Sequence, residues 1–510
     1  MARETEWVRF EDFSGGADTT SAHHLLAMNE SPEIINFWPL HRFGELVKRG
    51  GSVYLNTDTA NGGNENDGRL AAAAITGITK AYYSGGTQFV VVNCGNNLYS
   101  ITDAGLKDDI TTGTLNATGA ETFFEMYGDN LYIVNGNSTD LYMKWDGSAD
   151  VSSGNATKPA TVTSLVYLFW HDLMKRMIIL GGGSYGDNAY YSNVNLPESN
   201  QGFEAFRTQS GDRLVCGCST STRAVIFKRR SIFAWYGSSP AEFYKPRIYA
   251  NHGTEAPRSV VVDGDTVYYF GSDSLFHALQ GNKPVTIGNK VSITTKAIAK
   301  AMRSKVAGTK YYDYILWAYS DNGTSNNRVL AYDTRTGAWT FFWGLLVNCW
   351  HTNIGAADDY QVVFGVSNAI GRVNKFDTTT SDNGSKIPYQ WLSKAFSPGI
   401  GWPLRTQMNR IYMWAKADNT TINWSIDAEA SARRKSGSFT YVASGATYGD
   451  GSLYGDGTVY GGSDFVIKDM PCPLSGSEYR LIISGNDTKA VRIRRIALSY
   501  KQIRGEGWVG

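Results

Sequence analysis

Apolar and polar residues alternate along most of the chain in short stretches, and Gly, Asn or Asp residues separate the stretches. The pattern is clearest in ITKAYYSGGTQFVVVNCGNNLYSIT (78–102) and TFFEMYGDNLYIVNGNSTDLYMKWDG (122–147). A period of two is typical of β-strands, and the dipeptides GG, GD and GN are typical of tight hairpin turns. The sequence therefore predicts antiparallel hairpins that follow one another along the chain.

This unit recurs about every 45 residues, a spacing in the range of β-propeller blades. Further examples lie at 164–183, 213–237, 259–279, 311–342 and 361–377. Helical periodicity is scarce, and the Ala-rich window RLAAAAITGI (69–78) is too short to establish a helix. We therefore expect an all-β protein whose β-propeller has about six or seven irregular blades. Stacked β-sandwiches are the alternative, because hairpins repeat in them as well. Periodicity also does not determine the number of blades.

A Pro- and Gly-rich stretch, SPGIGWP (397–403), indicates a boundary between domains. Alternating stretches resume after it and predict a separate C-terminal β-sandwich. Among them, ATYGDGSLYGDGTVYGGSDF (446–465) predicts a long exposed loop or hairpin. The expected organisation is therefore an N-terminal arm or platform segment (1–70), a β-propeller (71–396) and a β-sandwich platform domain (397–510).

Composition and charge narrow the class of protein. Hydrophobic residues make up 42% of the 510 residues, enough to bury a core without metal or disulfide support. The net charge of +1 lacks the basic excess that tight binding to nucleic acid or to anionic membranes requires. An odd number of cysteines, mostly in strand-like runs, predicts reduced core thiols at Cys94, Cys216, Cys218, Cys349 and Cys472.

The chain begins with the polar stretch MARETEWVRFEDFSGG. No later stretch approaches the roughly 20 apolar residues of a membrane-spanning helix. We therefore expect neither an export signal nor a membrane anchor.

Residue patterns typical of enzymes are weak in this sequence. SDNGTS at Ser320 and SDNGS at Ser381 superficially resemble the Asp boxes of sialidase-like propellers. Both have Asp directly after Ser and lack the Trp, so ordinary Asn-Gly turns explain them better. Gly181 to Gly183 lack the Lys and Ser/Thr of a phosphate-binding loop and are interpreted as a turn.

Metal-binding patterns are also weak. His23 and His24 are adjacent and therefore cannot share one helical face, and Cys216-x-Cys218 has no second cysteine pair at zinc-like spacing. Asp450 and Asp456 lack the fixed ligand series of a calcium loop. We expect no catalytic, cofactor-binding or metal-binding residues, and no enzyme activity.

Three basic runs could touch DNA phosphates weakly, although solvated strand faces explain them better. They are Lys228 to Arg230, Arg433 to Lys435 and Arg492 to Arg495.

The N-terminal segment contains a loose but ordered motif. Its members are Phe13, Gly15, Gly16, Glu30, Ser31, Pro32, Asn36, Lys48, Arg49 and Gly50. This start resembles that of bacteriophage virion proteins, in which a Phe/Gly-Gly opening precedes an acidic Ser-Pro stretch, an Asn and a basic Arg-Gly element. Residues 257–291 and 373–396 resemble propeller-to-sandwich elements of tail hub or nozzle proteins of short-tailed phages. At the turn Asp273-Ser274, the resemblance leads us to expect Gly at the second position.

The resemblance implies a structural virion protein of a phage tail, made in the host cytoplasm. It implies a homo-oligomeric ring, expected to have six copies, below the portal and adaptor and beside tail fibre or spike proteins. Such a ring conducts DNA during ejection and retains it beforehand, with only weak, non-specific DNA contact.

Two other functions remain open. In a receptor- or glycan-binding tail propeller, exposed Trp145, Trp235 or Trp339 would stack on sugars. A propeller hydrolase would need convergent carboxylates, or a nucleophile with its base, and the sequence shows no such set.

Overall fold

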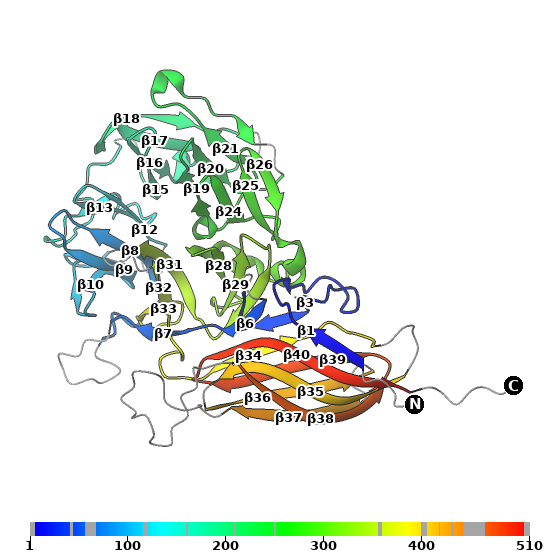
Figure 1. Cartoon of the computed structure of the whole chain (residues 1–510). Coiled ribbons are helices and arrows are strands. Elements are labelled where there is room, and N and C mark those ends of the chain that lie inside the picture. The colour runs from blue at the N-terminus through cyan, green and yellow to red at the C-terminus, as the bar shows by residue number, and fades with distance from the viewer. Residues whose placement is uncertain are drawn as a thin grey trace. The chain divides into compact units, whose positions relative to one another are not determined.

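The computed structural model describes residues 6–40, 44–56, 68–115, 121–159, 162–208, 211–248, 251–354, 360–398, 405–417, 419–429, 433–441 and 465–503. Strands dominate these residues (Figure 1). Within the described ranges the single α-helix is α1 (Ser292–Lys296), and the remaining helical segments are short 3-10 turns. No helix in these ranges is long and apolar enough to cross a lipid bilayer.

The chain forms two compact units, and each is described by itself. Unit 1 contains Met1–Ser52, Leu330–Trp343 and Asp377–Gly510, and unit 2 contains Val53–Val329 and Gly344–Phe376. Three strands span the boundaries between these ranges: β7 (Gly51–Tyr54), β29 (Arg328–Asp333) and β33 (Val373–Thr379).

Unit 2 is a series of small antiparallel sheets that follow one another along the chain. The first two are β8 (Ile75–Tyr82), β9 (Gln88–Cys94), β10 (Asn97–Ile101) and β11 (Lys107–Asp109), then β12 (Phe123–Tyr127), β13 (Asn130–Val134) and β14 (Met143–Trp145). The next two are β15 (Leu165–His171), β16 (Arg176–Gly181), β17 (Asn188–Asn193) and β18 (Leu196–Ala205), then β19 (Leu214–Ser219), β20 (Ala224–Lys228), β21 (Ile232–Trp235) and β22 (Arg247–Ile248).

The later strands of unit 2 continue this order. They are β23 (Val261–Asp263), β24 (Thr266–Phe270), β25 (Phe276–Gln280) and β26 (Lys283–Thr286), the pair β27 (Ala307–Tyr311) and β28 (Tyr314–Tyr319), and β31 (Val347–Ile354) with β32 (Tyr360–Val366). The 3-10 turns of unit 2 are η2 (Gly183–Tyr185), η3 (Pro240–Glu242), η4 (Pro257–Ser259), η5 (Gly288–Val291) and η6 (Lys300–Lys305).

These sheets are buried on both faces, which explains the continuous apolar runs in their middle strands. In β9, Val90 and Val92 pack with Cys349 and Val363, whereas the intervening Val91 packs on the opposite face against the next sheet. The same alternation occurs in β20. Each sheet therefore fills the space between its two neighbours.

The first strands of the sheets in unit 2 contact one another in chain order. Contacts run from β8 through β12, β15 and β19 to η4, then to β27 and β31, and β31 contacts β8 again. The start of unit 2 also meets its end, because the backbone amide of Leu55 donates a 2.8 Å hydrogen bond to the carbonyl of Val373. The series of sheets thus closes on itself.

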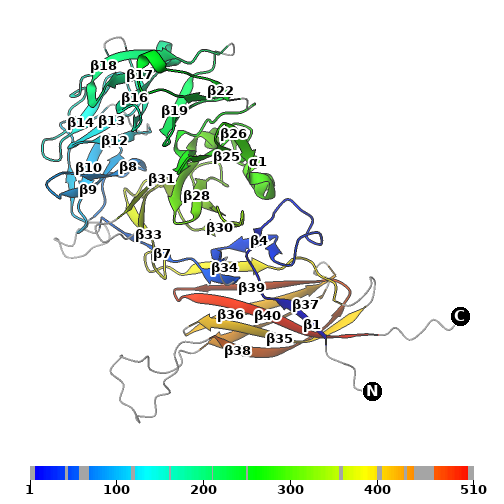
Figure 2. The same cartoon turned by 45° about the horizontal axis from the view of Figure 1, so that its top comes forward.

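Unit 1 contains two larger sheets (Figure 2). In one, β38 (Val466–Gly476), β35 (Thr406–Ala417) and β40 (Val491–Gln502) are neighbours, β40 also pairs with β1 (Glu6–Phe10) and β6 (Glu45–Lys48), and β6 pairs with β5 (Phe37–Leu40). In the other, the order is β30 (Trp339–Trp343), β4 (Glu33–Ile35), β34 (Ile387–Leu392), β39 (Tyr479–Asp487), β36 (Thr420–Ala428) and β37 (Arg433–Tyr441). A small parallel pair joins β2 (Gly16–Ala17) and β3 (Glu30–Ser31).

Aromatic side chains connect the two sheets of unit 1. The ring of Phe10 in β1 lies edge-on to that of Trp391 in β34, with 5.3 Å between ring centroids. The phenol of Tyr479 in β39 donates a hydrogen bond of 2.6 Å to the carbonyl of Thr406 in β35. All four side chains are buried.

The structure confirms the all-β prediction and the early hairpins, and the Ala-rich window 69–78 contains no helix. The five cysteines are buried and unpaired, as predicted. The expected division at 1–70, 71–396 and 397–510 differs from the observed units, because residues 330–343 and 377–396 belong to unit 1 with the N-terminal strands. Most of SPGIGWP, and nearly all of 446–465, lie outside the described residues.

Candidate functional site

The N-terminal motif surrounds one buried arginine in unit 1. Arg49 is fully buried, and its two terminal nitrogens donate hydrogen bonds to both carboxylate oxygens of Asp382, at 3.0 and 2.6 Å. Its Nε donates to the side-chain oxygen of Asn36 at 2.8 Å, and the terminal nitrogens also reach the carbonyls of Gly50 and Trp343. Such a two-pronged, charge-assisted contact is strong and directional. We call these five residues the Arg49 clasp.

Asn36 and other motif residues have further structural roles in unit 1. Asn36 has a positive φ of 55°, and Ser31 donates hydrogen bonds to the carbonyls of Glu33 and Leu392. Gly16 has a φ of 71°, and a Cβ there would lie 2.6 Å from the backbone nitrogen of Trp339. The motif therefore specifies how the N-terminal strands fit into unit 1.

Lys48 is buried in a cage of backbone carbonyls. Its Nζ donates to the carbonyls of Asp487 and Lys489 at 2.6 Å each, and to that of Thr380 at 3.3 Å. Burial lowers the pKa of Lys48 to about 8, and the charge of nearby Asp487 opposes this effect. The Lys-Arg-Gly element is thus part of the core rather than a basic surface.

The run from Arg492 to Arg495 is largely neutralised within unit 1. Arg492 and Arg494 donate hydrogen bonds of 2.6 and 2.8 Å to the two carboxylate oxygens of Glu45, which is fully buried. Arg495 lies 3.1 Å from Glu11. Each of these arginines thus has a carboxylate partner, and Arg492 and Arg494 share one.

The other two basic runs are also paired in part. In unit 2, Lys228 is fully buried and donates to Asp187 at 2.7 Å, and Arg229 pairs with Glu255. In unit 1, Arg434 makes a bidentate contact with Asp427.

The three tryptophans expected to bind sugars are buried. Exposed fractions are 3% for Trp145 and 0% for Trp235 and Trp339. Because these rings are buried, they cannot stack on a sugar at the surface, as the glycan-binding alternative would need.

The two SDNG segments form turns, as predicted. The side-chain oxygen of Asn322 accepts hydrogen bonds from the amides of Thr324 and Ser325, and Asn383 adopts a φ of 47°. In the second segment, the turn presents Asp382 to the Arg49 clasp. Asp382 therefore has a structural role that the search for an Asp box did not predict.

A cavity of about 650 Å³ in unit 2 is lined by the first strands of its sheets. The titratable side chains in its wall include Lys80 of β8, Glu125 of β12, Arg258 of η4 and His351 of β31. Burial raises the pKa of Glu125 to about 8, so this carboxyl is largely protonated at neutral pH. Burial and the charge of Lys80 lower the pKa of His351 to about 4, so the imidazole is neutral.

The cysteine in the wall of this cavity is poorly suited to act as a nucleophile. Burial raises the pKa of the Cys349 thiol to about 11, which keeps it protonated and weakly nucleophilic. The guanidinium of Arg258 donates to the carbonyls of Thr76 and Asn348 and lies 5.6 Å from the ring centre of Phe123. Arg258 thereby connects η4 with β8 and β31.

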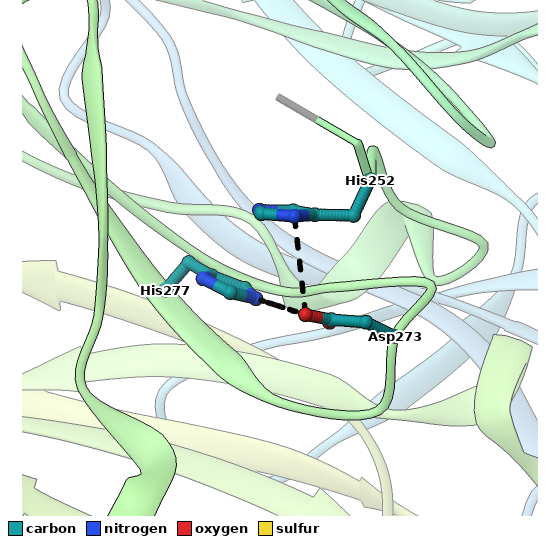
Figure 3. A group of neighbouring side chains, drawn as sticks. All are labelled: His252, Asp273 and His277. Atoms are coloured by element: carbon teal, nitrogen blue, oxygen red, sulfur yellow. Dashed lines mark hydrogen bonds and ion pairs between the residues drawn. The ribbon is translucent and has the colours of Figure 1, made fainter. Parts of the chain in front are cut away.

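A second cluster in unit 2 brings together His252, Asp273 and His277 (Figure 3). The Nε2–H of His277 donates to the carboxylate of Asp273 at 3.0 Å, and Nδ1 of His252 lies 3.8 Å from Oδ2 of the same carboxylate. Burial raises the pKa of Asp273, but the hydrogen bond from His277, the charges of His277 and His252 and the Leu275 amide together hold it below its usual value. Burial and neighbouring His277 lower the pKa of His252.

Three different segments supply this cluster, which the sequence analysis missed. His252 lies in the loop after β22, Asp273 in the turn between β24 and β25, and His277 in β25. Ser274 has a φ of 67°, a conformation that favours Gly, so the turn has the geometry expected from the resemblance despite its Ser. The only signal in the sequence was the spacing Asp-x-x-x-His, which is too common to indicate a site.

Comparisons with known proteins identify no family. No protein-family model matches the chain, and no curated protein matches it. Two solved structures are similar to part of it. The WD40 domain of Pan2 from Neurospora crassa has 9% identity and a TM-score of 0.41, and the match covers 65% of this chain and 95% of that one. YCF48 bound to a D1 peptide has 9% identity and a TM-score of 0.39, with 65% and 96% covered. At such values neither likeness carries an argument.

Proposed function

We propose that this chain is a structural subunit of a bacteriophage tail. It forms a nozzle or hub ring at the head-tail connection, below the portal and adaptor, that retains DNA and conducts it during ejection. The observation that carries the proposal is the N-terminal motif. Three of the ten residues on which the resemblance to phage virion proteins rests, Asn36, Arg49 and Gly50, meet in the buried Arg49 clasp. These motif residues therefore have a structural role in unit 1.

The arrangement of strands supports the architecture that this function needs. In our proposal, unit 2 is a seven-bladed propeller, because successive first strands contact one another and the last contacts the first. Unit 1 is a β-sandwich platform whose two sheets are joined through Phe10, Trp391 and Tyr479. Both parts are built from paired strands around buried cores, which suits the wall of a conduit.

The charge distribution also suits a channel wall. DNA binding strengthens with each phosphate that a free Lys or Arg neutralises, and a strong grip would hinder ejection. Arg492, Arg494 and Lys228 are engaged with carboxylates. This arrangement favours the weak, non-specific DNA contact that the proposal requires. The three tryptophans proposed for the glycan-binding alternative are buried, and this alternative has no comparable support.

The direct test is the mass of the purified full-length chain in solution, combined with negative-stain images. The proposal expects rings whose mass is a multiple of 56.0 kDa, with six copies as the expected number. Because some rings assemble only on a neighbour, the measurement is repeated with portal-adaptor complexes from the same phage. A chain that stays monomeric in both conditions and is absent from virions would refute the proposal.

A further inference from the structure

Three side chains in unit 2 bring potential metal-binding atoms close together. The donor atoms are Nδ1 of His252, a carboxylate oxygen of Asp273 and Nε2 of His277, and all lie within 4.8 Å of one another (Figure 3). We propose that these residues bind one divalent transition cation of the zinc class. The inference does not depend on the function proposed above.

In each imidazole, the ring nitrogen that is not offered to the cation has a hydroxyl partner. Nε2 of His252 lies 3.0 Å from the hydroxyl of Tyr269, and Nδ1 of His277 lies 3.2 Å from that of Thr286. In metal sites, such a partner on the far nitrogen fixes the orientation of a ligating histidine. The other ring nitrogens lie near Asp273: Nε2 of His277 is hydrogen-bonded to its carboxylate at 3.0 Å, and Nδ1 of His252 lies 3.8 Å from it.

The carboxylate is also held in place from its own segment. The amide of Leu275 donates to Oδ1 of Asp273 at 3.2 Å, and the positive φ of Ser274 closes the turn. A Cβ at position 271 would lie 2.4 Å from Oδ1 of Asp273 and 2.8 Å from Cδ2 of His277. Gly271 therefore permits the close packing of two of the three ligands.

The spacing of the donor atoms suits a small cation. Zinc bonds to nitrogen and oxygen are about 2.0–2.2 Å long, so neighbouring donors in a tetrahedral site lie about 3.3 Å apart. The separations from Asp273 to His277 and to His252 are 3.0 and 3.8 Å, on either side of this value.

Binding requires His252 to turn. Its ring stacks on that of His277 with 3.9 Å between centroids and 19° between planes, and a cation bonds in the plane of an imidazole. The side chain of His277 is 1% exposed and belongs to β25, whereas that of His252 is 15% exposed and belongs to a loop. His252 is therefore the ligand that adjusts.

The donor set selects the class of cation. Two imidazoles and one carboxylate suit zinc and its transition-metal neighbours, whereas magnesium and calcium prefer sites made of oxygen. The side chain of Asp273 is 35% exposed, so water can complete the coordination. The bound ion would connect the loop after β22 to the β24–β25 hairpin and would stabilise this part of unit 2 by mass action.

The test is isothermal titration of zinc chloride into the full-length chain, after removal of any purification tag and of bound metal by EDTA and dialysis. One zinc ion per chain is expected, with a higher melting temperature in its presence. Asp273→Asn and His252→Gln each change a partly exposed ligand, so folding should survive, and circular dichroism without zinc checks this. Each variant should weaken zinc binding at least tenfold.

His24→Gln is the matched control, because His24 is exposed and lies outside the cluster. This variant should bind zinc with the wild-type affinity. Two results would overturn the proposal. One is the absence of zinc binding by the wild-type chain, and the other is unchanged binding in both Asp273→Asn and His252→Gln.

Discussion

Replacing Asp382 by Asn removes one charge from the Arg49 clasp with almost no change in shape. The oxygen of the new side-chain amide in Asp382→Asn can still accept a hydrogen bond from Arg49 or Ser52. The NH2 group of that amide, however, must then face an N–H donor of the guanidinium. Arg49 is fully buried and keeps only neutral partners in this variant. The substitution therefore leaves a buried cation without a counter-ion.

The size of the effect follows from burial. Breaking a buried ion pair by removing one partner typically costs about 3–5 kcal/mol. The side chain of Asp382 is 18% exposed, so water reaches part of the site, and we expect a loss of about 3 kcal/mol in unfolding free energy. With a urea m-value of about 3 kcal/mol/M, the midpoint should fall by about 1 M.

Urea unfolding is followed by tryptophan fluorescence and by circular dichroism. Asp469→Asn is the control, because Asp469 pairs with Arg410 in the same unit but both side chains are well exposed. An exposed pair contributes about 0–1 kcal/mol, so the control should unfold near the wild-type midpoint. A loss below about 1 kcal/mol in Asp382→Asn, or equal losses in both variants, would show that the clasp does not support unit 1 as argued.

Three further predictions concern buried groups. The pKa of Lys48 is lowered to about 8 in the fold, so the unfolded chain binds more protons above that pH, and stability should rise between about pH 8 and 10.5. Lys48→Met should abolish this rise in pH-dependent urea midpoints. The pKa of Glu125 is raised to about 8 in the fold. Its contribution to the free energy of unfolding is therefore complete below about pH 4.5 and is lost as the pH rises through 8. Glu125→Gln should flatten that slope, and an unchanged slope would contradict the protonated state. Gly16→Ala places a Cβ at positive φ against Trp339 and should lower the free energy of unfolding by more than about 1 kcal/mol. Gly128→Ala is the control, because it adds the same kind of backbone strain without a steric contact and should therefore cost less.

The local part of the fold was predictable from the sequence. Hairpins such as β8–β9 and β12–β13 were found because alternation and Gly turns act over a few residues, and Gly86 and Gly128 do adopt positive φ. The division into units was not predictable in the same way. It depends on pairing between distant segments, such as Phe341 in β30 with Ile35 in β4.

The functional residues were less accessible to sequence reasoning. The motif around Arg49 was visible, but its partner Asp382 was interpreted only as part of a turn. Trp235 was expected to be exposed and is buried, because a strand packed on both faces has no outward side. The cluster of His252 and Asp273 arises from a loop and a hairpin turn that only the tertiary fold brings together.

The central claim is that this chain is part of a phage tail, and the most direct measurement is antibody labelling of purified virions that carry its gene. Gold-labelled antibody raised against the chain should appear at the tail axis in electron micrographs, and peptides of the chain should be found in the same virions by mass spectrometry. Virions that contain no such peptides and bind no label at the tail would contradict the account.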